Sequence, residues 1–173
     1  MRRLLIALAI LGALHATPTR AAGGKGCDGF LWPLATELSW MKAADSAEVA
    51  SGATLKAPPS DKAIELKLVP AAEATLPATP TSTPKPEDAS AFGGVVNVEA
   101  LEAGHYQVTL SGDGWIDVVQ NDTALEATGH TGSKDCDGIR KSVRFEIGPG
   151  PFALQVSGAR KEHIRIAIRP AAD

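Results

Sequence analysis

Alternation of hydrophobic and polar residues dominates the C-terminal half of the chain. Between residues 92 and 169, hydrophobic side chains recur at every second position in short runs, which Gly-rich or Asn/Asp turns separate. A period of two places alternate side chains on opposite faces of a β-strand. About seven or eight such runs, roughly ten residues apart, are typical of an antiparallel β-sandwich. We therefore predict a mainly β, antiparallel sandwich core over residues 92–169.

The centre of this block predicts a hairpin. Residues 104–110 and 115–119 flank Gly112-Asp113-Gly114, a sequence that favours a tight turn between paired strands. Alternation predicts one face toward the core, formed by Tyr106, Val108, Leu110, Ile116 and Val118. It predicts a second face toward the outside, formed by His105, Gln107, Thr109, Trp115 and Asp117.

The segment before the β block contributes one more strand and a long loop. Residues 63–69 alternate between aliphatic and charged side chains, which predicts a half-buried strand that joins the sandwich. Residues 70–90 contain five prolines among Ala, Thr and Ser, and this composition buries too little apolar surface to order itself. It is either a linker between domains or a crossover loop. We favour the loop, because the preceding strand alone makes no domain.

Residues 27–50 predict an N-terminal helix. Pro33 suits a first helical turn, and Leu34, Leu38 and Met41 recur at a spacing that places them on one helix face. Gly52 would end the helix. Hydrophobic residues accompany this stripe, namely Phe30, Leu31, Trp32 and Trp40. They predict either a helix packed on the sandwich, which we favour, or a box of aromatic side chains that holds a ligand.

The first residues predict export. Arg2 and Arg3 precede an apolar run, Leu4–Leu14, of only eleven residues. A bilayer-spanning helix needs about twenty, so residues 1–22 are interpreted as a signal peptide. We expect a periplasmic or secreted protein, with no membrane span in the mature chain.

The charge of the mature chain argues against nucleic acid as a partner. Without the arginines of the leader, the 17 basic residues of the chain fall to 14, against 20 acidic ones, for a net charge of −6. No basic patch interleaved with aromatic residues is visible. Acids concentrate in residues 97–137 and bases in residues 139–169. Either the two halves neutralise each other across strands, which we favour, or a bipolar surface docks a charged partner.

Two cysteines predict a disulfide. Cys27 and Cys136 are the only cysteines of the chain, and lone pairs of cysteines usually join in an oxidising compartment. The bond would tie the start of the mature chain to a loop of the β block. Neither cysteine lies in a CxxC pair or beside a histidine pair, so thiol chemistry and metal binding gain no support here.

The outward side of the central strands carries the candidate binding residues, which are His105, Trp115, Asp117, Arg140 and Arg144. An exposed tryptophan beside charged groups is how sugar-binding sandwiches hold a sugar ring. The alternative is structural: the N-terminal helix covers Trp115, and Asp117 forms an ion pair with Arg140 or Arg144.

Catalytic and metal-binding patterns are weak. The chain has no G-x-S-x-G motif, and no serine or cysteine has an identifiable histidine partner. Aspartates suited to calcium are present at positions 113, 117, 122, 135 and 137, but no D-x-[DN]-x-[DN]-G loop unites them. We therefore predict no catalytic residue, no metal and no cofactor.

Three stretches of the β block carry a family resemblance: Glu102–Val108, Trp115–Val119 and Gly148–Val156. Their order resembles the bacterial pre-peptidase C-terminal type of β-sandwich and its relatives among carbohydrate-binding jelly rolls. In that fold the first is a glycine-led alternating strand, the second places an aspartate in a central strand, and the third is the penultimate hairpin. The resemblance covers about half the chain and implies fold more than activity.

The mature chain is also similar to small exported proteins of proteobacteria, some of which carry the label homogentisate 1,2-dioxygenase. That resemblance would imply iron held by two histidines and a glutamate in a much longer cupin. The mature chain offers only His105, His130 and His163, without that spacing. We therefore predict an exported, non-catalytic sandwich that binds a glycan or a partner in the cell envelope. The alternative is a metal-dependent enzyme that matches the label.

Overall fold

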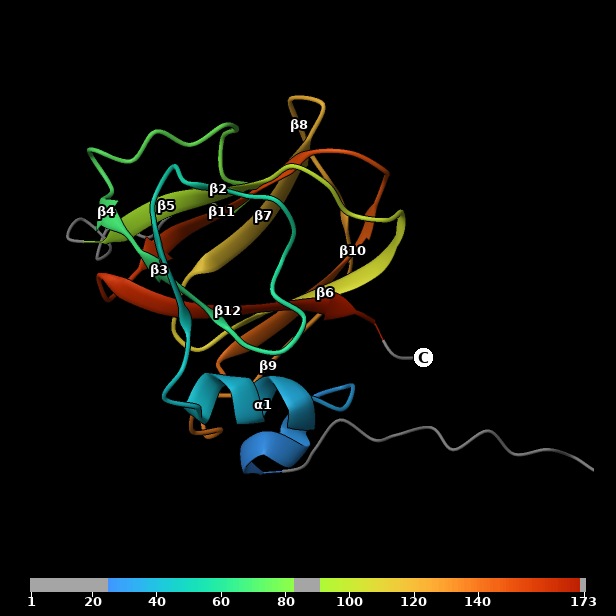
Figure 1. The fold of residues 1–173 in the computed structure, drawn as a ribbon. Helices are drawn as coiled ribbons and strands as arrows, with labels where there is room; N and C mark the ends of the chain where they lie inside the picture. The colour runs from blue at the N-terminus through green and yellow to red at the C-terminus, as the bar shows by residue number, and fades with distance from the viewer. Residues whose placement is uncertain (1–24, 83–90, 172–173) are drawn as a thin grey trace, which may run out of the picture.

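Two β-sheets packed face to face, with one α-helix on the outside, form the computed structural model of the chain (Figure 1). The structure describes residues 25–82 and 91–171. It confirms the predicted mainly β sandwich with a helix packed on it. The predicted signal peptide, residues 1–22, lies outside the described residues. Within them, no helix is both long and apolar enough to cross a bilayer.

Sheet A has six strands, of which only the first two pair in parallel. In spatial order they are β1 (Ala47–Ala50), β3 (Ile64–Lys67), β12 (His163–Pro170), β6 (Gly104–Leu110), β10 (Lys141–Ile147) and β9 (Ala127–Gly132).

Sheet B also has six strands, and β2 pairs in parallel with β5. In order they are β2 (Thr54–Leu55), β5 (Phe92–Val98), β11 (Phe152–Ala159), β7 (Trp115–Gln120) and β8 (Thr123–Ala124), with β4 (Val69–Pro70) also paired to β5. Both sheets are therefore mixed, although most of their pairings are antiparallel.

The core lies between the sheets, where the alternation placed it. The five residues predicted to face inward are all buried in this cluster: Tyr106, Val108, Leu110, Ile116 and Val118. The predicted strand over residues 63–69 likewise buries Ile64, Leu66 and Leu68 and pairs, as β3, with β12. Aliphatic side chains at every second strand position therefore form the main apolar core of the fold.

The predicted hairpin is wrong. Strand β6 pairs with β10 and β12 in sheet A, whereas β7 pairs with β11 and β8 in sheet B. Residues 111–114 therefore cross from one sheet to the other. Alternation reports which face of a strand is buried, but both sheets bury a face in the same core. Leu110 on sheet A and Ile116 on sheet B thus enter the same core from opposite sheets, and they are not neighbours within one sheet.

The predicted helix over residues 27–50 is too long. The segment forms a 3₁₀ turn, η1 (Gly26–Gly29), then α1 (Ala35–Lys42), and then strand β1. Strand β1 pairs with β3 from Ala47 opposite Ile64 to Ala50 opposite Lys67. Residues 47–50 pair with the edge of β3, and this tertiary pairing outweighs their local helical preference. Residues 129–132, a polar stretch without alternating hydrophobic residues, likewise belong to β9 beside β10.

The Pro-rich loop is more ordered than its composition predicts. Residues 71–82, here called the strap, are described and lie against the outer face of sheet B, while residues 83–90 lie outside the described part. The strap follows β4, and β4 pairs with β5, so the segment between these two strands connects neighbours in one sheet, as the crossover-loop interpretation expected. Its order comes from hydrogen bonds supplied by sheet B, which composition does not reveal.

Candidate functional site

The predicted binding residues do not form one cluster. Trp115 and Asp117 lie on β7 in sheet B, whereas His105 and Arg144 lie on β6 and β10 in sheet A, and Arg140 lies in the loop before β10. The separation follows from the crossing between β6 and β7. Because these strands belong to different sheets, their outward faces point to opposite sides of the sandwich.

On sheet B, Trp115 and Asp117 are bonded to the strap. The Trp115 Nε1 group donates hydrogen bonds to Thr81 Oγ1 at 2.7 Å and to Asp117 Oδ1 at 3.0 Å. The Lys141 Nζ atom lies 4.4 Å from the centroid of the Trp115 ring. Burial, and then the neighbouring Arg140, lower the pKa of Lys141. Trp115 is therefore already engaged by protein groups on its ring and its nitrogen.

This arrangement corrects both interpretations of the sequence. Asp117 is buried, so it is no open sugar-binding carboxylate, and its recorded partners are Thr81, Trp115 and Gln155 rather than either arginine. The strap, and not the N-terminal helix, lies beside Trp115.

On sheet A, the N-terminal segment covers the outward face. Trp32 stacks under the Arg144 guanidinium, 4.3 Å from ring centroid to Cζ, and its Nε1 group donates to Ser142 Oγ at 3.2 Å. His105 lies at an exposed position, where its Nε2 atom is 2.6 Å from Glu146 Oε2. Arg144 and the aromatic residues before α1 therefore hold the helix to the sheet, as the packing interpretation expected.

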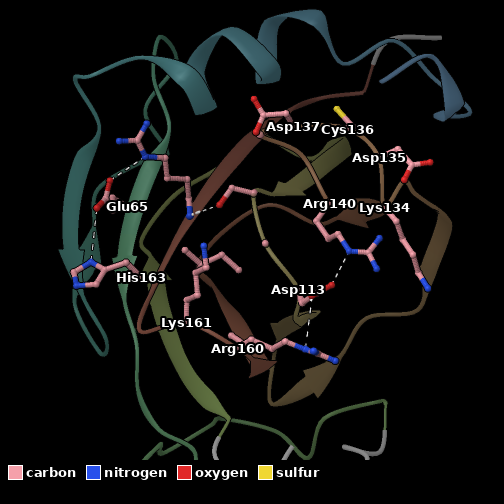
Figure 2. Close-up of a pocket in the computed structure, with 16 residues that line it drawn as sticks. Glu65, Asp113, Lys134, Asp135, Cys136, Asp137, Arg140, Arg160, Lys161 and His163 are labelled. Carbon is pink, nitrogen blue, oxygen red and sulfur yellow. Dashed lines mark hydrogen bonds and ion pairs between the residues drawn. The ribbon is translucent and has the colours of Figure 1, made fainter. Parts of the chain in front are cut away.

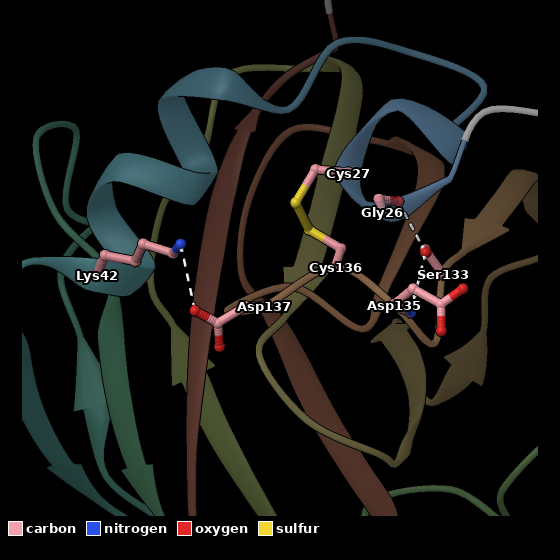
Figure 3. Close-up of a disulfide and its surroundings, with 7 residues drawn as sticks. All are labelled: Gly26, Cys27, Lys42, Ser133, Asp135, Cys136 and Asp137. Atoms are coloured by element: carbon pink, nitrogen blue, oxygen red, sulfur yellow. Dashed lines mark hydrogen bonds and ion pairs between the residues drawn. A yellow bond between two sulfur atoms is a disulfide. The ribbon is translucent and has the colours of Figure 1, made fainter.

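The predicted disulfide between Cys27 and Cys136 is confirmed (Figure 3). It joins η1 to the loop between β9 and β10, here called the disulfide loop, residues 133–140. Two contacts flank it: Ser133 Oγ donates to the Gly26 carbonyl oxygen at 2.9 Å, and Lys42 Nζ lies 3.3 Å from Asp137 Oδ2. The disulfide thereby fixes the position of η1, at the start of the N-terminal segment, relative to the disulfide loop.

Beside the disulfide loop lies an open cleft of about 770 Å³ at one end of the sandwich (Figure 2). Three connections form it: the β6–β7 crossing, the disulfide loop, and the turn between β11 and β12. Its charged lining includes Asp113, Lys134, Asp135, Arg140, Arg160 and Lys161. Of these, only Arg140 belongs to the five predicted binding residues, while Asp113 and Asp135 belong to the aspartates considered for calcium. The rest come from loops far apart in the chain, and no periodic pattern unites them.

Two acids of the cleft, Asp113 and Glu65, are paired with arginines that also line it. Asp113 lies between two arginines, with Arg140 Nε at 2.6 Å from Oδ1 and Arg160 Nε at 3.7 Å from Oδ2, as Figure 2 shows. At the other side, Glu65 Oε2 accepts from Arg165 Nε at 2.9 Å. A hydrogen bond from Ser46, and then the bond from Arg165, lower the pKa of Glu65.

Two lysines at the cleft remain available to a ligand. Within the described residues, neither Lys134 nor Lys161 has a recorded ion pair or side-chain hydrogen bond. The carboxylate of Asp135 is likewise unpaired there, and Asp137 is paired outward with Lys42. Arginine and lysine groups of this kind donate to carboxylate, phosphate or sulfate oxygens.

The separation of acids and bases along the chain produces only some of the observed ion pairs. Arg140 and Arg160 both pair with Asp113, as mutual neutralisation of the two halves predicts. By contrast, Arg165 pairs with Glu65 and Arg169 with Glu37, both of which precede the two halves.

Among residues 25–82 and 91–171, no group of three or more His, Cys, Asp or Glu side chains is arranged to hold a metal ion.

The chain was compared with known proteins at the level of families, curated sequences and solved structures. No family model matches it, and no curated protein or solved structure is significantly similar to it. The resemblance to pre-peptidase C-terminal-like sandwiches therefore stays a prediction.

Proposed function

We propose that the chain is an exported, non-catalytic β-sandwich protein that binds a glycan or a partner protein in the cell envelope, with the cleft as its binding site. One observation carries the choice of site. The basic side chains of the disulfide loop and of the β11–β12 turn meet around Asp113, an acid that two arginines already neutralise. Lys134 and Lys161, which also line the cleft, have no ion pair or side-chain hydrogen bond to the described part of the chain.

The disulfide supports the exported compartment. Structural disulfides persist in the periplasm and outside the cell, and are rare in the cytosol. The bond joins Cys27 to Cys136, and a hydrogen bond from Ser133 to the Gly26 carbonyl oxygen also links the two segments that carry these cysteines. The charged n-region and short apolar run at the N-terminus agree with export.

The cleft favours an anionic ligand. Its lining, as far as the structure describes it, contains no Phe, Trp or Tyr on which a sugar ring would stack. Recognition would instead come from guanidinium and ammonium donors, led by Arg160 and Lys161, on carboxylate, phosphate or sulfate groups. An acidic glycan or an acidic protein surface meets this requirement, although the mature chain as a whole is itself acidic.

Charge reversal tests the site. We expect Lys134→Glu or Lys161→Glu to weaken binding to acidic members of a glycan array, or capture of an envelope protein, by roughly tenfold. Lys56→Glu is the matched control, because Lys56 is an exposed lysine that does not line the cleft. Binding that both cleft variants retain would refute the cleft. Loss of binding in Trp115→Ala alone, with the fold intact, would place the binding site on the outer face of sheet B instead.

The alternative, a metal-dependent enzyme, is tested on the same purified protein. Stoichiometric iron, zinc or calcium, or a rise in melting temperature when one of these ions is added, would favour it over a binding protein.

A further inference from the structure

Two polar side chains on the outer face of sheet B are buried, which is unusual for positions that point away from the core. Gln155 on β11 is 0% exposed and Asp117 on β7 is 2% exposed. Buried amide and carboxylate groups require hydrogen-bond partners. Gln155 bonds to Asp117, with Nε2 3.0 Å from Oδ2, and both side chains find their other partners largely on the strap.

Gln155 recognises the backbone of the strap. Its Oε1 atom accepts from the Ala78 N–H group at 3.2 Å, and its Nε2 group donates to the Ala78 carbonyl oxygen at 3.1 Å. One side-chain amide thus satisfies both polar groups of a single residue, as a neighbouring strand would. These contacts recognise the backbone of Ala78, which lies in a bend of the strap, and make no demand on the side chain except that it be small enough to fit.

Thr81, three residues later, is recognised through its side chain. Its hydroxyl donates to Asp117 Oδ1 and accepts from Trp115 Nε1 at 2.7 Å. Its N–H group donates to Asp117 Oδ2 at 3.4 Å. A hydroxyl that both donates and accepts is required here, because a valine of the same shape would leave the buried carboxylate and the indole N–H without this partner.

The floor between these two contact points is apolar and separate from the main core. Ala78 packs against Val95, Val119 and Ala153, which form a cluster distinct from the one between the sheets. Removing the strap would therefore leave the main core covered. It would also return Gln155 and Asp117 to water, which can hydrogen-bond them.

Few other contacts hold this part of the strap. For residues 75–82, every recorded hydrogen bond to the described part of the chain goes to Gln155, Asp117 or Trp115. Pro77 and Pro80 each fix their own φ angle, which lowers the entropy lost on binding. The strap thus contacts sheet B as a docked peptide does, at two points three residues apart.

We propose that the outer face of β7 and β11 is a peptide-recognition site for a short segment of a partner protein that adopts the backbone course of the strap. The segment carries a small residue followed, three positions later, by threonine or serine, with prolines between or beside them. The strap is its resident occupant, and the partner segment displaces it. This site is distinct from the cleft, so it stands whether or not the cleft binds a glycan.

The test uses the full chain and a synthetic peptide of its own residues 74–82 as the probe. Binding is followed by NMR at the indole N–H of Trp115, which Trp115→Phe identifies among the three tryptophans. In the wild-type chain the covalently attached strap competes at an effective concentration near millimolar, so the peptide should bind weakly. In Thr81→Val, whose strap lacks the hydroxyl, we expect binding about fivefold tighter, while Thr81→Ser should behave like the wild type.

A matched peptide with valine at the position of Thr81 should not shift the Trp115 resonance in the Thr81→Val protein. Equal binding of the two peptides, or no shift at millimolar peptide, overturns the proposal.

Hydrogen exchange on the wild-type chain gives a second measurement, which does not depend on whether a variant folds. The Ala78 and Thr81 amides should exchange through a local opening, at least a hundredfold faster than the Val118 amide of β7. If they exchange only as fast as Val118, the strap opens only with the whole fold and the proposal fails.

Discussion

The two outer faces of the sandwich are both covered, but the two covers are attached by different means. The N-terminal segment, residues 26–42, lies on sheet A with a disulfide, a buried carboxylate and its own apolar cluster. The strap lies on sheet B through a few hydrogen bonds to three side chains and one small apolar contact. Figure 1 shows α1 beneath β9 and β12 and the green strap after β4 on the other side.

The difference separates a structural cover from a removable one. Phe30, Trp32, Leu34 and Met41 of the N-terminal segment are buried in its apolar cluster, so lifting the segment would expose large apolar side chains. Lifting the strap would expose Val95, Val119 and Ala153, which are smaller. Hydrophobic stabilisation scales with the apolar area buried, so the cover of sheet A contributes far more to folding. Function at an outer face is therefore expected on sheet B.

The largest expected effect comes from the covalent tie. The double variant Cys27→Ser/Cys136→Ser should lower the free energy of unfolding by about 2–5 kcal/mol, because the unfolded chain regains the freedom of a closed loop. Denaturant titration measures the loss, and the wild type under reducing conditions is the control. A loss below about 1 kcal/mol would mean that the helix is held by its apolar contacts alone.

The second effect tests the buried carboxylate under the helix. Glu37 is 0% exposed, and its Oε1 atom lies 2.5 Å from Gln107 Nε2 and 3.3 Å from Arg169 Nη1. Glu37→Ala should cost about 1–3 kcal/mol, since both donors lose this partner. Glu37→Gln keeps an acceptor and should cost less. Equal losses in the two variants would show that shape, not hydrogen bonding, is what the site requires.

A smaller effect is expected on sheet B. Thr81→Val should lower the free energy of unfolding by about 1 kcal/mol or less, because Asp117 and Trp115 can hydrogen-bond water once the strap lifts. Thr81→Ser should be nearly neutral. Thermal unfolding of the pair measures this, and a loss as large as that of Glu37→Ala would remove the distinction between the two covers.

The smallest effect depends on pH and concerns the end of α1. Arg165 donates from Nη1 to the carbonyl oxygens of Met41 at 2.8 Å and Ala43 at 2.6 Å, and its Nε group binds Glu65. The pKa of Glu65 is held below its ordinary value of 4.5, so its contribution to stability is fully present above that pH. It is lost as pH falls through the lowered pKa. Unfolding measured between pH 6 and the acid limit should show a shallower fall in Glu65→Gln.

Particular residues show how far sequence reasoning reached. Val108 and Ile116 were predicted to face the core, and they do, because period-two burial is a local property of a strand. The pairing of Cys27 with Cys136 was predicted from their number and the expected oxidising compartment. The prediction that Trp115 and Arg144 share one face was wrong, because the local sequence of β7 does not specify that it pairs with β11 rather than β6. The ordered strap was missed because its hydrogen-bond partners lie on β7 and β11, distant in sequence.

The sequence by itself determined the β character of the chain, the buried face of each strand, the disulfide and the signs of export, because each depends on residue type and short-range spacing. Only the tertiary structure decided which strands share a sheet, where α1 ends, and which segment covers Trp115. It also brought Asp113, Lys134 and Arg160 to one cleft. These depend on pairings between distant segments, where many partners satisfy the same local pattern and the packing of the whole chain selects one.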